Sequence, residues 1–212
     1  MNLALVAVSC ESRKLEFAMK LIRSTTQADM VAVFLQAEIA SKRFGHMILD
    51  LLEQDGKSRT VVDMPDITSS EENTYRRQLL AAYRAYVFNE LPAHIAWYRA
   101  LLTREEVARI RYIDYDYWNE LSSHTRLPRV ASGAIVAGRE IFGVSNKAFL
   151  DVAQALREGV RFPELILVGA SPTAVLTVYE GHVRLTAYML APEYLPKVLE
   201  VIVGFAPECA QL

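Results

Sequence analysis

The sequence predicts an α+β protein, because the pattern of apolar and polar residues changes near residue 108. About residues 1–108 read as a mainly helical region, whereas residues 109–212 alternate helical patterns with short β-rich runs. The chain has 212 residues, of which 52% are hydrophobic and 23% are charged. This composition is typical of a globular protein with a substantial core, and the length allows one large domain or two small ones.

The first half is expected to be built from helices. Residues 14–52 show broad helical spacing of apolar positions, and Gly56 in the run EQDGKS is suited to end that helix. Ser69 or Ser70 can cap a second helix over Asn73–Tyr86. Beyond Pro92 the sequence predicts one or two further helices, and Thr103 with Glu106 forms a capping-box pattern.

The second half mixes both kinds of element. RYIDY, beginning at Arg111, alternates enough to predict a strand, and Ser145–Gly159 predicts a helix with Ser145 as its N-cap. ELILVGA and AVLTVYEG are β-rich runs separated only by SPT, which predicts a hairpin or adjacent strands. A helix over HVRLTAYMLA, a short helix around Pro196 and a last strand at EVIVGF complete the pattern.

Charge and cysteine content narrow the functional classes. The net charge is −2 and the pI is about 6.1, so general nucleic-acid binding is not indicated, although a local basic patch stays open. Cys10 and Cys209 form no CxxC pair, so no zinc site is readable and a reducing environment is the default. The apolar run Leu3–Val8 is too short to span a bilayer and is expected to be a buried strand or helix start. We therefore expect a cytoplasmic protein without membrane contact.

The most informative stretch joins the strand AVLTVY to the helix that follows it. The joining residues are Glu180, Gly181, His182, Val183 and Arg184. A helix N-terminus carries free backbone N–H groups and partial positive charge, so this position suits a phosphate. Arg184 can add a fork of donors and His182 can donate or transfer a proton near neutral pH, while Thr186 keeps the next turn small. The alternative is a turn made by Gly181, with Glu180 as a cap and Arg184 paired with a neighbouring acid.

The order helix, FPELILV strand, second strand and EGHVR turn resembles the ParB/sulfiredoxin superfamily over about residues 110–205. Its G-x-x-R turn reads G-E-R-R in ParB proteins and G-C-H-R in sulfiredoxins, and the serine kinases have a D-G-H-x-R-like turn that is closest to Glu180–Arg184 here. The resemblance implies a small mixed-sheet domain that binds ATP, ADP or CTP with Mg²⁺. It implies phosphate contacts by Gly181, His182 and Arg184. The turn lacks a cysteine, which excludes sulfiredoxin chemistry, and no ParB-type helix-turn-helix is readable after it.

A second polar cluster precedes this region. YIDYDYWNELSSHTR contains Asp114, Asp116 and Glu120, followed by His124 and Arg126. One of the acids, Asp116 in our assignment, is expected as a general base, and Arg126 as a second phosphate contact. The alternative is an aromatic core strand with a polar rim.

Three arginines on the Asn73–Tyr86 helix raise a similar choice. Arg76, Arg77 and Arg84 can form a face for an anionic ligand or nucleic acid, or a solvated helix face.

These observations lead to one preferred function and two alternatives. The preferred function is nucleotide binding, with ATP- or ADP-dependent phosphotransfer or nucleotide hydrolysis on an unidentified small molecule. Glu180, His182 and Asp116 are the expected catalytic residues, and Gly181, His182, Arg184, Thr186 and Arg126 the expected phosphate ligands. No protein metal site is expected. The alternatives are a non-catalytic module that binds nucleotide or a partner, and a ParB-like nucleic-acid-binding or nuclease protein.

Overall fold

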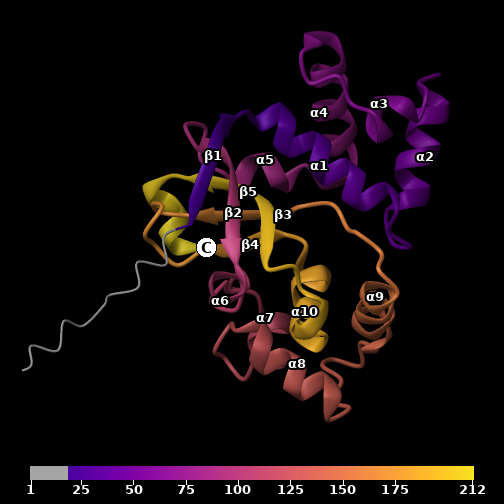
Figure 1. The fold of residues 1–212 in the computed structure, drawn as a ribbon. Coiled ribbons are helices and arrows are strands. Elements are labelled where there is room, and N and C mark those ends of the chain that lie inside the picture. The colour runs from indigo at the N-terminus through magenta and orange to yellow at the C-terminus, as the bar shows by residue number, and fades with distance from the viewer. Residues whose placement is uncertain (1–18) are drawn as a thin grey trace, which may run out of the picture.

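A computed structural model describes residues 19–212 and confirms the α+β class, with a mixed sheet and a helical N-terminal region (Figure 1). The sheet has five strands in the order β1-β2-β5-β3-β4. Strand β5 pairs in parallel with β3 and antiparallel with β2, and the two outer pairings are antiparallel. The strands are β1 (Lys20–Thr25), β2 (Ala96–Thr103), β3 (Leu165–Gly169), β4 (Thr177–Glu180) and β5 (Val198–Phe205).

Both faces of the central strands are buried. In β3, Leu165 and Leu167 belong to one hydrophobic core, while Ile166 and Val168 belong to the other. This split follows from the two-residue period of a strand, which sends neighbouring side chains to opposite faces. The expected strand and hairpin over ELILVGA and AVLTVYEG are confirmed as β3 and β4.

One face of the sheet is covered by helices from the first half of the chain (Figure 1). Helix α1 contributes a nearly continuous buried run, and α4 packs across it through Leu79 and Leu80. Ser69 caps α4 as predicted, since its hydroxyl accepts a hydrogen bond from the Glu72 backbone N–H. These helices are α1 (Gln27–Ile39), α2 (Gly45–Gln54), α3 (Thr60–Asp63), α4 (Ser70–Arg84) and α5 (Tyr86–Glu90).

The opposite face is covered by helices from the second half, with α10 packed against α8 and α9. The helix predicted over HVRLTAYMLA is confirmed, as is the one after Ser145, although Asn146 occupies its N-cap position. The helices of this layer and the two 3₁₀ turns are α6 (Arg104–Val107), α7 (Asp116–Leu121), α8 (Pro128–Val136), α9 (Lys147–Arg157), α10 (His182–Leu190), η1 (Pro192–Tyr194) and η2 (Pro207–Gln211).

Two predictions of helix in the first half are wrong in part. Residues 20–25 and 96–103 form strands β1 and β2, and the chain breaks again before α2 at Gly45. Strand β2 has buried side chains on both faces, with Trp97 in one core and Ala100 in the other. Such a strand shows little alternation and cannot be distinguished from a buried helix by periodicity. The Thr103–Glu106 capping box is confirmed at the start of α6.

The segment RYIDY is not a strand. Only Arg111 forms a β-bridge, with Thr177, and the chain then turns into α7 at Asp116. The expected boundary near residue 108 therefore falls beside a sheet to which both halves contribute, since β1 and β2 precede it and β3 to β5 follow it. The division into regions 1–108 and 109–212 stays a prediction, and the expected element at Leu3–Val8 lies outside residues 19–212.

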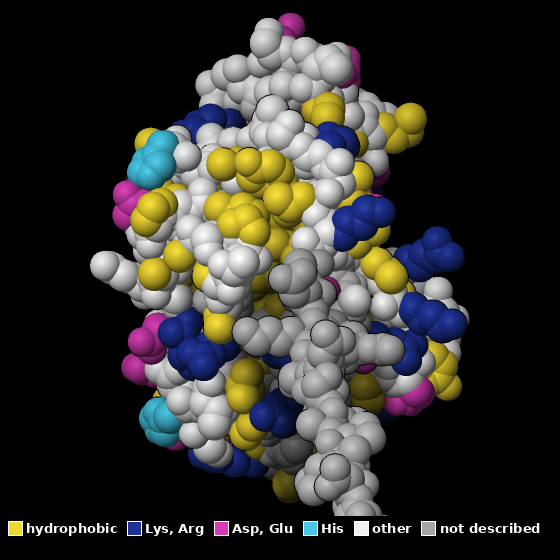
Figure 2. All heavy atoms as spheres, turned by 60° about the vertical axis from the view of Figure 1, so that its left-hand side comes forward, with side chains coloured by type: hydrophobic (Ala, Val, Ile, Leu, Met, Phe, Trp, Pro, Cys, Tyr) yellow, Lys and Arg dark blue, Asp and Glu magenta, His cyan; other side chains and the backbone are white. Residues whose placement is uncertain are grey.

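Strand β1 forms one edge of the sheet and is exposed on both faces. Leu21 and Ile22 keep 37% and 47% of their surface exposed. Figure 2 looks onto this side of the molecule, where hydrophobic side chains gather next to separate basic ones. This side is consequently less completely covered than the two helical layers.

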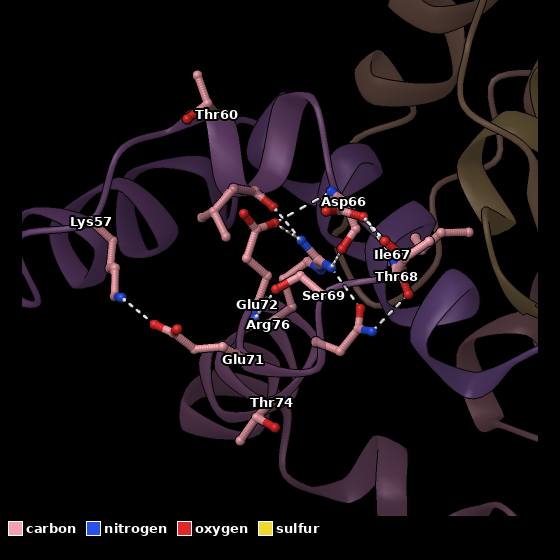
Figure 3. Close-up of polar contacts among 12 residues, drawn as sticks. Lys57, Thr60, Asp66, Ile67, Thr68, Ser69, Glu71, Glu72, Thr74 and Arg76 are labelled. Atoms are coloured by element: carbon pink, nitrogen blue, oxygen red, sulfur yellow. Dashed lines mark hydrogen bonds and ion pairs between the residues drawn. The ribbon is translucent and has the colours of Figure 1, made fainter.

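The arginines of α4 differ sharply in their surroundings. Arg76 is fully buried and donates hydrogen bonds to the backbone carbonyl oxygens of Val61 and Asp66 (Figure 3). Its guanidinium also bonds the side chains of Glu72 and Asn73. Arg76 therefore organises the loop between α3 and α4, and the predicted solvated face is wrong for this residue.

Candidate functional site

The junction between β4 and α10 is built around Gly181. Its φ of 102° lies in the left-handed region, and a Cβ there would lie 2.5 Å from Leu165 Cδ2. Glycine is required on both counts, since other residues meet a steric penalty at this φ and would clash with Leu165. The chain can thus turn directly from the sheet into α10.

Arg184 points back from the first turn of α10 toward the start of β3. Its Nη1 donates to the backbone carbonyl oxygens of Pro163 and Glu164, the latter at 2.9 Å. Its Nη2 lies 3.3 Å from Glu180 Oε1, which forms an ion pair across the turn. Arg184 is buried and therefore fixes the position of α10 relative to β3 in this conformation.

His182 lies in an aromatic stack on the α7 side of α10. Its ring is 4.9 Å from the Trp118 ring and inclined by 16°, and it is 6.1 Å from the Tyr112 ring. The ring Nε2 is buried without a hydrogen-bond partner. Burial, followed by the positive charges of Arg184 and Arg84, lowers the pKa of His182 to about 3. At neutral pH the imidazole is therefore uncharged and cannot serve as a general acid.

Thr186 is fully buried one turn further along α10. Its hydroxyl donates to the His182 backbone carbonyl oxygen at 2.7 Å and lies 2.6 Å from the Tyr112 hydroxyl. A threonine hydroxyl has one proton, so Tyr112 is the donor in the second hydrogen bond. Thr186 thus connects α10 to the segment before α7.

A second pair of charges flanks the turn on the side of the N-terminal helices. Arg84 of α4 forms an ion pair with Glu38 of α1 and also contacts the Tyr86 hydroxyl. Burial raises the pKa of Glu38, and the charge of Glu180 raises it further against the effect of Arg84. Two carboxylates and two guanidinium groups therefore meet around the end of β4.

The pair was missed by sequence reasoning because Glu38 and Arg84 lie far apart in the chain. One signal was present: Glu38 is a carboxylate within the apolar run VFLQAEI, where a buried charge requires a partner. Nothing in the sequence identified Arg84, rather than Arg76 or Arg77, as that partner.

Asp116 and Arg126 take different places. Asp116 is exposed as the first residue of α7, the helix that carries the stacking residue Trp118. Arg126 donates to the backbone carbonyl oxygen of Tyr112 at 2.7 Å and to that of Leu212. These hydrogen bonds fix the loop before α8 and do not reach Glu180–Arg184. Their predicted catalytic and phosphate-binding roles stay predictions.

Other features of the described residues that bear on function are surface hollows, possible metal sites and possible membrane helices. Two surface hollows, of about 280 and 380 Å³, lie elsewhere, one beside β1 and one at the N-terminus of α9. Within residues 19–212, no three His, Cys, Asp or Glu side chains are grouped to hold a metal ion. In the same range, no helix has the length and hydropathy needed to cross a membrane.

No protein-family model matches the chain, and no curated protein or solved structure matches it either. The geometry of the turn and its surroundings is therefore the basis for a function.

Proposed function

We propose that the protein binds a nucleotide or small phosphorylated ligand through a phosphate group at the N-terminus of α10. The observation that supports this most is a helix N-terminus with two guanidinium groups nearby. The first backbone N–H groups of a helix have no partner within the helix, and the charges of Arg84 and Arg184 both act on His182, its first residue. A phosphate placed at this point would meet N–H donors and two guanidinium groups.

To bind, the phosphate would replace the Glu180 carboxylate beside Arg184. The Arg184 Nη2 to Glu180 Oε1 distance of 3.3 Å is long for a charge-assisted hydrogen bond. Glu180 is also partly exposed, so it can turn away while phosphate oxygens take its place. The two hydrogen bonds from Arg184 Nη1 to backbone carbonyl oxygens can remain during this exchange.

Phosphotransfer or hydrolysis would depend on carboxylates, because burial and the low pKa of His182 make it a poor proton acceptor at neutral pH. Glu180 is the expected acid or metal-positioning group, but it is paired with Arg184, and Glu38 is paired with Arg84. These two carboxylates do not form a preassembled metal site, so Mg²⁺ would arrive with the nucleotide phosphates, where it neutralises charge. The low pKa of His182 favours the second candidate function, a binding module without catalysis.

Titration calorimetry with ATP, ADP, CTP and GTP, with and without Mg²⁺, tests the proposal. Replacing Glu180 by Gln removes the competing charge, so we expect the variant to bind about threefold to tenfold more tightly. Glu193→Gln is the matched control, since Glu193 is an exposed acid in η1, and it should leave binding unchanged. Arg184→Lys keeps the charge but loses the fork, and it should weaken binding.

Two results would contradict the proposal. The first is no measurable heat with any of these nucleotides or with inorganic phosphate. The second is binding that changes with neither Glu180→Gln nor Arg184→Lys while circular dichroism shows both variants folded. Release of phosphate from ATP, measured in parallel, separates the catalytic from the non-catalytic form of the function. The expected cytoplasmic location is part of this proposal and follows only from the sequence.

A further inference from the structure

The hollow beside β1 lies where the chain passes from that strand into α1. It has a volume of about 280 Å³ and is lined by residues 24–27 on one side and by residues 93 and 95–98 on the other. None of these lining residues belongs to the Glu180–Arg184 turn. Ser24, Thr26 and Gln27 of its lining carry hydrogen-bond donors, and Trp97 carries one that is buried.

Trp97 provides the first indication of a ligand. Only 5% of this residue is exposed, and its indole Nε1 is buried with no hydrogen-bond partner. An unpaired buried donor is destabilising, and such groups are rare unless a water or ligand satisfies them.

The N-terminus of α1 provides a second, independent set of donors. The 13-residue helix begins at Gln27, and its N-cap Thr26 accepts a hydrogen bond from the Asp29 N–H. The backbone N–H groups of Gln27 and Ala28 precede that bond and have no partner within the helix. Helix N-termini of this kind attract anions.

Side chains at the rim of the hollow add further hydrogen-bond donors. Arg77 Nη1 donates to Gln27 Oε1 at 2.6 Å, which leaves the amide NH₂ of Gln27 free to donate. The Thr26 hydroxyl oxygen accepts from Asp29, so its proton is also free. The Ser24 hydroxyl is exposed and makes no side-chain hydrogen bond.

The acid in the first turn of α1 does not oppose an anion. Arg99 holds both carboxylate oxygens of Asp29 at 2.8 Å, and Arg23 lies 3.9 Å away. Burial alone would raise the pKa of Asp29, but hydrogen bonds from Arg99 and Thr25 outweigh burial and hold the pKa below its ordinary value. The carboxylate is thus ionised and paired within the protein, with Arg99 shared between Asp29, Glu164 and Glu200.

We propose that this hollow is a binding site for a small tetrahedral oxyanion, namely a phosphate group. A phosphate presents only acceptors when fully ionised, which matches a site whose contributing groups donate. The group can be free inorganic phosphate or the terminal phosphate of a larger molecule. The site is separate from the phosphate site proposed at α10.

The two tryptophans of the chain make the proposal directly testable. Trp97 lines the hollow, whereas Trp118 stacks on His182 at the other site. In a ¹H–¹⁵N NMR spectrum each gives one indole N–H signal, which Trp97→Phe and Trp118→Phe assign. Titration with inorganic phosphate should shift the Trp97 signal saturably, while sodium chloride at equal ionic strength should not. A shift of Trp118 alone would report the α10 site, so the failures of the two proposals are distinguishable.

Two variants measure the contribution of the donors. Ser24→Ala should weaken phosphate binding about threefold to tenfold, and Trp97→Phe, followed through the amide signals of Gln27 and Ala28, should weaken it about tenfold or more. Ser70→Ala, an exposed serine at the start of α4, is the matched control and should have no effect. Binding should also be unchanged by Arg184→Lys.

The ligand class is decided in the same titration. A phosphate monoester that shifts Trp97 as inorganic phosphate does indicates a ligand larger than the free ion, whereas a response to inorganic phosphate alone indicates the free ion. An equal response to acetate would overturn the assignment of a tetrahedral anion. No saturable shift of Trp97 with tens of millimolar phosphate, or an equal shift with chloride, would overturn the site itself.

Discussion

Glu38 of α1 and Arg84 of α4 form an ion pair although 46 residues separate them. The carboxylate is almost completely buried, and the guanidinium also lies 3.9 Å above the ring of Phe44. Removing one member of a buried pair leaves an uncompensated charge, which is more costly than the pair itself is stabilising. This relationship joins α1 to the last residue of α4.

We expect Glu38→Ala to lower the free energy of unfolding by about 3 kcal/mol. Urea denaturation of Glu38→Ala, Arg84→Ala and the double variant measures the coupling. The double variant should be less destabilised than the sum of the single changes, because it leaves neither charge unpaired. Additive effects would show that the two side chains stabilise the fold independently.

The pH dependence of stability should report His182. The unfolded chain protonates this residue below its ordinary pKa of 6.5, whereas the folded protein does so only near 3. The unfolded state therefore binds more protons between these values, and stability should fall as pH falls through this window. The slope contributed by one such group is at most about 1.4 kcal/mol per pH unit.

Replacing His182 by Phe keeps an aromatic ring against Trp118 and removes the titration. Denaturation midpoints at several pH values between 4 and 7 should then show a shallower decline than those of the unmodified protein. His94→Gln, which changes an exposed histidine paired with Glu208, is the matched control and should keep the decline. Equal slopes in all three proteins would contradict the assignment to His182.

Thr186→Val should expose the contribution of the hydrogen bond to Tyr112. The change keeps the shape of the side chain but leaves the buried Tyr112 hydroxyl without its 2.6 Å partner. We expect a loss of about 1–3 kcal/mol in unfolding free energy. Tyr112→Phe added to Thr186→Val should cost little more than Thr186→Val alone, since no donor then remains unpaired.

Arg76→Met should loosen the loop between α3 and α4. Methionine preserves much of the length of the side chain but none of its hydrogen bonds to Val61, Asp66, Glu72 and Asn73. Limited proteolysis should then cleave within residues 57–70 faster than in the unmodified protein. The adjacent, exposed Arg77 offers the control Arg77→Met, which should leave the cleavage rate unchanged.

The sequence predicted the second half of the fold better than the first because local signals there agree with tertiary structure. A glycine turn between a β-rich run and a helical run suffices to predict β4 and α10. Strands β1 and β2 were not foreseen because their partners are distant in the chain. Strand β1 pairs with β2, about 75 residues further on, and β2 also pairs with β5, about a hundred residues beyond it. Long-range pairing decided their conformation over local propensity.

The candidate site, too, could be predicted from the sequence only where local signals determine it. The sequence correctly identified a turn between a strand and a helix at Gly181, and the structure adds that this glycine has the left-handed conformation. It could not show that Arg184 reaches back to Pro163, that His182 is stacked on Trp118, or that Glu38 and Arg84 approach from another layer. Each of these contacts joins residues that are distant in the chain, and such contacts produce no local sequence pattern from which they could be predicted.

The central place of β5 has a consequence for how the protein folds. This strand is the last of the five in the chain, yet β2 and β3 both pair with it and not with each other. A chain that has not yet reached residue 198 can form only two unconnected strand pairs, β1 with β2 and β3 with β4. Closure of the sheet must therefore wait until residues 198–205 have been synthesised, and until then the unpaired edges of β2 and β3 are open to chaperones or to aggregation.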